Sequence, residues 1–150
     1  GVDGGLLRAE KLVVPEGDLG YVGHIVAVNI SLLETLLGAG FVPIISPLSL
    51  GYDGECYNVN ADQAAQGLAE NIQAKSLVFL TNVDGVMIEG EIRPTLSVDE
   101  VETLIKEGHI YGGMEPKVRS AVEALTKGAG SVVIASTKSF LANGGTRIVS

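Results

Sequence analysis

The sequence is short of several features that mark large functional classes. The 150 residues carry only 10 Lys and Arg against 18 Asp and Glu, a formal net charge of −8, and aromatic residues make up 5%. An acidic chain without a basic run is poorly suited to binding nucleic acid. No apolar run approaches the roughly 20 residues that a membrane-spanning helix needs, and the first residues show no signal-peptide pattern. We therefore expect neither nucleic acid nor a membrane as a partner.

Cysteine is also nearly absent. The single Cys56 has no partner for an internal disulfide, which is typical of the reducing cytoplasm. We accordingly expect a cytoplasmic protein and a small, buried, apolar role for Cys56. What the chain does have is 46% hydrophobic residues, enough for a proper core, over the length of one domain.

Strand-like and helix-like segments alternate along the chain. Strands are predicted at residues 21–29, 41–46, 55–60, 76–81 and 131–135, and a hairpin at 86–92 that turns at Glu89-Gly90. Helices are predicted from a capping box at Ser31 and Glu34 to Gly38 or Gly40, over residues 63–73, from a capping box at Ser97 and Glu100 to Gly108, and over residues 116–127. This order predicts an α/β fold, a three-layer αβα sandwich with a mostly parallel sheet covered on both faces.

The stretch Asn58-Val59-Asn60-Ala61-Asp62 places two amides and a carboxylate two residues apart, where a strand gives way to a helix. In an extended segment the three polar side chains share one face, while Val59 and Ala61 point into the core. The polar trio would then lie beside a helix N-terminus, whose free N–H groups favour anions. This pattern predicts a polar ligand site. The competing interpretation is that Asp62 is only an N-cap and the asparagines belong to a loop.

A second stretch, Gly112-Gly113-Met114-Glu115-Pro116-Lys117, runs into the last predicted helix. Paired glycines permit unusual backbone angles or the close approach of a ligand, and proline suits a first helical turn. Lys117 in that turn opposes the helix dipole, so an anion is expected nearby. A phosphate held by the glycine-loop amides and the ammonium fits best. The alternative is a solvated surface lysine after a glycine hinge.

These motifs resemble those of the amino-acid kinase family. The matching segments are residues 58–65 (NVNADQAA), 80–86 (LTNVDGV) and 112–118 (GGMEPKV), in that order, with residues 145–148 (GTRI) as a further similarity. The resemblance runs from about Asp18 to the C-terminus and is strongest to members that phosphorylate N-acetyl-L-glutamate. It implies that residues 1–150 are the C-terminal, ATP-binding part of an amino-acid kinase domain, whose N-terminal half is absent from this chain.

The resemblance also implies a reaction and a site. ATP, with Mg²⁺, would phosphorylate the side-chain carboxylate of N-acetyl-L-glutamate to an acyl phosphate, a step of arginine biosynthesis. Lys117 and Asp62 would be catalytic, the first by its charge and the second by organising lysine ammonium groups, and Asn58 and Asn60 would bind the acceptor. The nucleotide would contact Thr81, Asn82, Val83, Asp84, Gly85, Val86, Met87, His109, Gly112, Gly113 and Met114. No protein metal site is expected, because neither His24 nor His109 has metal-ligand spacing.

Two alternatives stay open. One is a related kinase acting on another acyl acceptor, such as carrier-linked aminoadipate, and the other is a non-catalytic nucleotide-binding module. The family's N-terminal half normally carries a glycine-rich phosphate loop, a second lysine and an arginine that grips the acceptor. The resemblance therefore implies that the isolated chain is inactive and that the full-length protein is a homo-oligomer.

Overall fold

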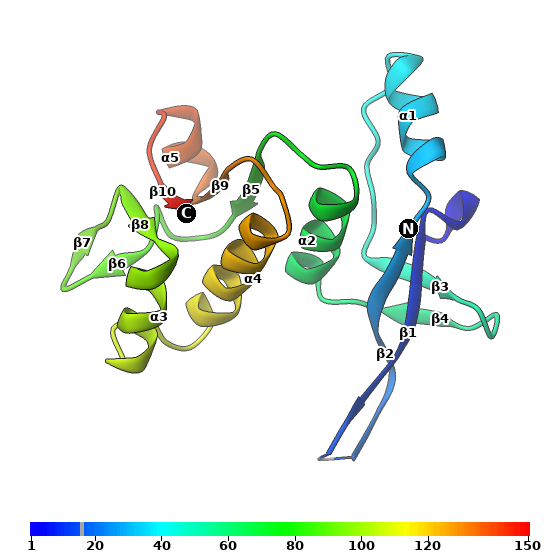
Figure 1. Cartoon of the computed structure of the whole chain (residues 1–150), viewed down its shortest axis with the longest axis horizontal. Helices are drawn as coiled ribbons and strands as arrows, with labels where there is room; N and C mark the ends of the chain where they lie inside the picture. The colour runs from blue at the N-terminus through cyan, green and yellow to red at the C-terminus, as the bar shows by residue number, and fades with distance from the viewer. Residues whose placement is uncertain (16) are drawn as a thin grey trace. The chain divides into compact units, whose positions relative to one another are not determined.

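The computed structural model describes residues 1–15 and 17–150 (Figure 1). The chain divides into two compact units: unit 1 is Gly1–Ile72 and unit 2 is Gln73–Ser150. Both units contain helices and strands, so the α/β prediction is confirmed. Among the described residues, no helix combines the length and hydropathy of a membrane-spanning segment.

Unit 1 is built around a small closed barrel with the strand order β1-β2-β4-β3. The strands are β1 (Leu7–Val14), β2 (Gly17–Val28), β3 (Leu48–Gly51) and β4 (Cys56–Asn58). Two antiparallel pairs, β1 with β2 and β3 with β4, are joined by parallel pairings of β1 with β3 and β2 with β4. The remaining elements are η1 (Asp3–Gly5), α1 (Ile30–Gly38) and α2 (Ala61–Asn71).

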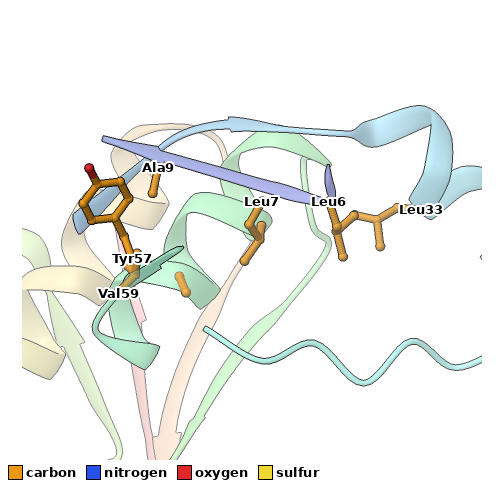
Figure 2. Close-up of a cluster of buried hydrophobic side chains, with 7 residues drawn as sticks. Leu6, Leu7, Ala9, Leu33, Tyr57 and Val59 are labelled. Atoms are coloured by element: carbon orange, nitrogen blue, oxygen red, sulfur yellow. The ribbon is translucent and has the colours of Figure 1, made fainter. Parts of the chain in front are cut away.

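The core of unit 1 gathers apolar side chains from β1, β4 and the two helices. Figure 2 shows Leu7 and Ala9 pointing from β1 towards the side on which Tyr57 of β4 and the following Val59 lie. Leu7 and Ala9 are fully buried and Val59 is 1% exposed. The inward position of Val59 was predicted, and it turns the flanking Asn58 and Asn60 to the surface.

Unit 2 is an open mixed sheet with the strand order β5-β9-β10-β8. Its elements are β5 (Leu77–Leu80), β8 (Thr95–Ser97), β9 (Val132–Ala135), β10 (Thr146–Val149), the hairpin of β6 (Met87–Ile88) and β7 (Glu91–Ile92), and the helices α3 (Val98–Lys106), α4 (Met114–Thr126) and α5 (Thr137–Leu141). All four residues of β9 are buried, because β5 and β10 flank it and α4 and α5 contact it. Within the described residues, four strand pairings are parallel and four antiparallel. The four-stranded sheet of unit 2 has two parallel pairings and one antiparallel pairing, so the prediction of a mostly parallel sheet is confirmed only in part.

Local signals predicted several boundaries correctly. The hairpin turns at Glu89 and Gly90, whose φ angles of 52° and 86° are those of a tight turn. The capping box of Ser97 and Glu100 opens α3, with the Ser97 hydroxyl accepting from the Glu100 N–H at 3.2 Å. Gly108 and Gly128, with φ angles of 77° and 108°, follow the ends of α3 and α4.

Other predictions of local structure are wrong. Residues 41–46 form no strand: Val42 and Ile44 are 87% and 100% exposed, and no partner strand lies beside the segment in the described chain. The cap of α1 is Asn29 rather than Ser31, because the Asn29 side-chain oxygen Oδ1 accepts from the Leu32 N–H at 3.2 Å and the helix starts at Ile30. Cys56 is exposed, because its neighbour Tyr57 takes the inward position on β4.

Candidate active site

In unit 2 the loop after β5 lies at the carboxyl ends of two parallel strands, β5 and β9. The Thr81 N–H donates to the Ala135 carbonyl at 2.9 Å, which continues the pairing of β5 with β9. Asp84 in this loop accepts a hydrogen bond from the Ser136 hydroxyl at 2.5 Å. Ser136 is also the N-cap of α5 and accepts from the Ser139 N–H at 3.0 Å. The loop is thus held where ligands commonly bind in α/β sheets.

A narrow hollow of about 180 Å³ opens between this loop and the start of α4. It is lined by Val83, Gly85, Val86, Met87, His109, Ile110, Tyr111 and Met114. Six of these eight residues were predicted from the sequence, and only Ile110 and Tyr111 were not. The buried wall is apolar, since Val86 is fully buried and Ile110 is 2% exposed. Such a hollow suits a flat apolar ring.

A wide hollow of about 670 Å³ adjoins the narrow one and shares Val83 and Met87 with it. It is lined by Asn82, Val83, Asp84, Met87, Gly90, Glu91 and Ile92. Its carboxylates accept hydrogen bonds from sugar hydroxyls, whereas they repel a bare phosphate. The wide hollow therefore favours a hydroxyl-rich or cation-carrying part of a ligand.

The N-terminus of α4 begins at Met114, a residue of the narrow hollow. Gly112 has a φ of 60°, which a glycine adopts without strain, and Gly113 is the N-cap. No described side chain caps this helix, whose first N–H, that of Met114, donates to the Tyr111 carbonyl at 3.4 Å; a helix N-terminus of this kind favours an anion. A Cβ at Gly112 or Gly113 would meet no heavy atom of the described chain within 4 Å. Lys117, the fourth residue of α4, is half-buried.

The polar trio lies at the β4–α2 junction of unit 1. Asn60 is the N-cap of α2, and its side-chain oxygen accepts from the N–H groups of Asp62 at 2.9 Å and Gln63 at 3.3 Å. The interpretation of Asp62 as the cap is therefore wrong. Ala61 is exposed, contrary to prediction, because α2 already begins there and the strand alternation stops. Asn58 stays exposed at the end of β4, and Asp62 is half-buried in the first turn of α2, where the helix dipole favours a carboxylate.

Some residues that line or support the hollows of unit 2 were given no role from the sequence, among them Ile110, Tyr111, Ser136 and Thr146. Ile110 and Tyr111 lie between the predicted His109 and Gly112, so their position in the chain was a usable signal. Ser136 directly follows a predicted strand, and strand ends of a sheet gather at one edge. Thr146 was quoted only within the similarity of residues 145–148 and given no role, because its partners lie more than 50 residues away.

Metal ligands and histidines add little to the site. Among residues 1–15 and 17–150, no cluster of three or more His, Cys, Asp or Glu side chains is arranged to hold a metal ion. His109 lines the narrow hollow, and its Nε2 lies 3.9 Å from a Glu107 carboxylate oxygen.

Known proteins resemble the chain in sequence and in fold. The acetylglutamate kinase of Geobacillus thermodenitrificans is 46% identical over 147 residues, which are 97% of this chain and 56% of that protein. The enzyme of the same name from Aquifex aeolicus is 49% identical over 146 residues, 89% of this chain and 49% of the relative. The chain thus spans about half the length of these curated relatives.

Solved structures share the architecture. N-acetylglutamate synthase from Neisseria gonorrhoeae, complexed with coenzyme A and N-acetyl-glutamate, superposes with a TM-score of 0.90 at 30% identity, over 97% of this chain and 37% of that one. Carbamate kinase from Giardia lamblia bound to AMP-PNP gives a TM-score of 0.71 at 21% identity, over 95% of this chain and 60% of that one, and shows the fold alone. The family model of the amino acid kinase family matches residues 1–136. This protein therefore belongs to the amino acid kinase family.

Proposed function

We propose that this chain is the C-terminal, ATP-binding part of an acetylglutamate kinase, which phosphorylates the side-chain carboxylate of N-acetyl-L-glutamate. The observation that carries the proposal is the narrow hollow, where the loop after β5 meets the start of α4 and predicted nucleotide contacts line one space. The identity to acetylglutamate kinases supports the choice of acceptor.

In this proposal each part of the nucleotide lies beside residues that suit its chemistry. The adenine ring lies in the narrow hollow, and the ribose hydroxyls face Asn82 and Asp84 in the wide one. The phosphates reach the uncapped N-terminus of α4 and Lys117. The same segments supply the remaining contacts, from Thr81 and from the glycines at 112 and 113.

The reaction needs little acid–base catalysis from the protein. The acceptor carboxylate is already ionised at neutral pH, so no general base is needed. Catalysis then rests on holding the two substrates in line and on neutralising charge on the transferred phosphoryl group. Lys117 supplies positive charge and Asp62 organises lysine ammonium groups by charge-assisted hydrogen bonds. Asn58 binds the acceptor, with Asn60 beside it, the latter through its amide N–H₂ because its oxygen caps α2.

Mg²⁺ enters with the nucleotide. Mg²⁺ that accompanies a nucleotide is held mainly by phosphate oxygens and water, with few protein ligands. Such an ion shields the phosphate charge.

In the intact protein we further propose a cytoplasmic homo-oligomer in which the sheet of unit 2 continues into a three-layer αβα sandwich.

The proposal is tested on the intact protein that contains this chain. A hydroxamate assay detects the acyl phosphate formed from Mg-ATP and N-acetyl-L-glutamate, with carrier-linked aminoadipate as the competing acceptor. Of the two acceptors, we expect only N-acetyl-L-glutamate to be phosphorylated. Faster turnover with the aminoadipate acceptor than with N-acetyl-L-glutamate would contradict this assignment. Residues 1–150 alone should bind Mg-ATP weakly and give no product. Clear turnover by this fragment would mean that the catalytic groups are misplaced.

A second candidate function is a non-catalytic ligand-binding module. The structural match to N-acetylglutamate synthase shows that this fold also occurs in a protein of a different name, so the fold alone does not decide between the two functions. The same assay separates the two functions. A module binds nucleotide or an acetylated amino acid in calorimetry and forms no acyl phosphate at any enzyme concentration.

A further inference from the structure

A buried hydroxyl lies at the base of the β6–β7 hairpin. Thr146, the first residue of β10, is fully buried. Its Oγ1 accepts a hydrogen bond from the Val86 N–H at 2.8 Å and donates one to the Arg93 carbonyl at 2.6 Å. One side chain thus bonds the backbone on both sides of the hairpin.

The hydroxyl takes the place of a direct bond between the two hairpin strands. The hairpin pairs Met87 with Ile92, and the Arg93 N–H then donates to the Val86 carbonyl at 2.9 Å. In a hydrogen-bonded antiparallel pair, Val86 would return a bond to the Arg93 carbonyl. Here that second bond runs through Thr146 instead. Val86, Arg93 and Thr146 are therefore bonded to one another, and Thr146 attaches the hairpin base to the sheet through β10. We call these three residues the junction.

The junction sets the walls of both hollows. Val86 and Met87 line the narrow hollow, and Met87 and Ile92 line the wide one. Packing under the junction is close, since a Cβ at Gly85 would lie 2.8 Å from Thr146 Oγ1 and 2.8 Å from Ile92 Cγ2. If the hydroxyl were lost, the buried Val86 N–H would have to move to find another acceptor.

We propose that Thr146 is a positioning residue for the nucleotide: its buried hydroxyl holds the hairpin base at the separation that shapes both hollows. This inference rests on the proposed nucleotide site. Thr146 does not line either hollow, so it acts through Val86 and Met87 rather than by touching the ligand.

The test compares two substitutions in the intact protein by calorimetry with Mg-ATP. Thr146→Val keeps the shape of the side chain and removes both hydrogen bonds, whereas Thr146→Ser keeps the hydroxyl. We expect Thr146→Val to raise the dissociation constant for ATP about tenfold, the equivalent of one good hydrogen bond, and Thr146→Ser to stay within about twofold of wild type. The KM for N-acetyl-L-glutamate should change less than the KM for ATP.

A matched control separates positioning from general stability. Ile148→Val removes one methylene from a fully buried side chain two residues along the same strand. It should lower the melting temperature and leave ATP affinity unchanged. Unchanged ATP affinity in Thr146→Val, or an equal loss in Ile148→Val, would overturn the inference.

A measurement on the wild type covers the case in which Thr146→Val does not fold. In hydrogen–deuterium exchange of the intact protein, the amide of Val86 should exchange slowly, because it donates to a buried hydroxyl. Fast exchange there would overturn the inference. If the wild type does not bind ATP at all, the proposed function fails, while slow Val86 exchange would still establish the junction.

Discussion

The two units fix their candidate site residues by different means. In unit 2 the loop after β5 is held by partners distant in the chain: Thr146 lies 60 residues beyond Val86, and Ser136 lies 52 residues beyond Asp84. In unit 1 the polar trio is held by local bonds, from the Asn60 side chain to backbone groups two and three residues on. The loop after β5 is therefore shaped by tertiary contacts within unit 2, and the start of α2 in unit 1 by helix capping.

Apolar runs in the two units make the same contrast. The run of residues 132–135 forms β9 and is buried throughout, between β5 and β10. The run at residues 41–46 has a similar composition, yet Val42 and Ile44 face water. An apolar sequence becomes a strand only where a neighbouring strand accepts its hydrogen bonds. Unit 2 supplies that neighbour within the described chain and unit 1 does not.

The largest expected effect is that of Lys117→Ala in unit 2. Removing one charge-stabilising group costs about 10²- to 10³-fold in kcat, because its charge is needed most in the transition state. We expect a loss of this size in the intact protein, with an unchanged melting temperature. Steady-state kinetics would measure it, with the exposed Lys106→Ala as control. A near-normal kcat would remove Lys117 from the catalytic groups.

The next largest expected effect is that of Asn58→Ala in unit 1, at the proposed acceptor contact. Asn58→Ala should raise the KM for N-acetyl-L-glutamate about tenfold, the loss of one hydrogen bond, and leave the KM for ATP unchanged. Asn58 is exposed, so folding should not suffer. Initial rates with each substrate varied in turn would measure both constants. A change confined to the KM for ATP would contradict the proposed role of Asn58 in binding the acceptor.

Gly85→Ala probes the tertiary packing of unit 2. The new Cβ would lie 2.8 Å from Ile92 Cγ2 and from Thr146 Oγ1, both closer than real contacts allow. Overpacking of this kind costs about 1–3 kcal/mol of stability, and it should also raise the KM for ATP severalfold by displacing Val86. Thermal unfolding and kinetics would show both effects. Gly38→Ala, where a Cβ meets no described atom within 4 Å, should be neutral.

The smallest effect is a pH dependence in unit 1. The Tyr57 hydroxyl donates to an Asp53 carboxylate oxygen at 2.5 Å, which lowers the pKa of Asp53 and raises the pKa of Tyr57 to about 12. The bond favours neutral Tyr57 in the folded state. Its stabilisation is therefore complete below pH 10.0, the ordinary tyrosine pKa, and is lost as the pH rises towards 12.

Asp53 gives the opposite dependence at acid pH. Its folded pKa is lowered, so the stabilisation is present above the ordinary value of 3.8 and is lost as the pH falls through the folded pKa. Thermal unfolding against pH should show the wild type losing a few more degrees than Tyr57→Phe at both extremes. Tyr52→Phe, at an exposed tyrosine of the same unit, is the control. Parallel curves for wild type and Tyr57→Phe would contradict the effect.

The sequence by itself determined what depends on residues close together in the chain. The capping box of Ser97 and Glu100 and the turn at Glu89-Gly90 follow from side chains and backbone angles within four residues. The family resemblance likewise named six of the residues that line the narrow hollow, four of them within its motif segments. Even local reasoning failed where two caps competed, since Asn29 and Ser31 are both good N-caps and the earlier one was used.

Only the tertiary structure decided which of these segments meet. The sheet of unit 2 is mixed because β10 returns antiparallel to β9, a choice that no residue pattern encodes. The junction at Thr146 joins β10 to two backbone groups, at Val86 and Arg93, that precede Thr146 by more than 50 residues, through bonds that form only once those segments pack. The physical reason is that a hydrogen bond or a buried contact depends on distance in space, whereas the sequence records only distance along the chain.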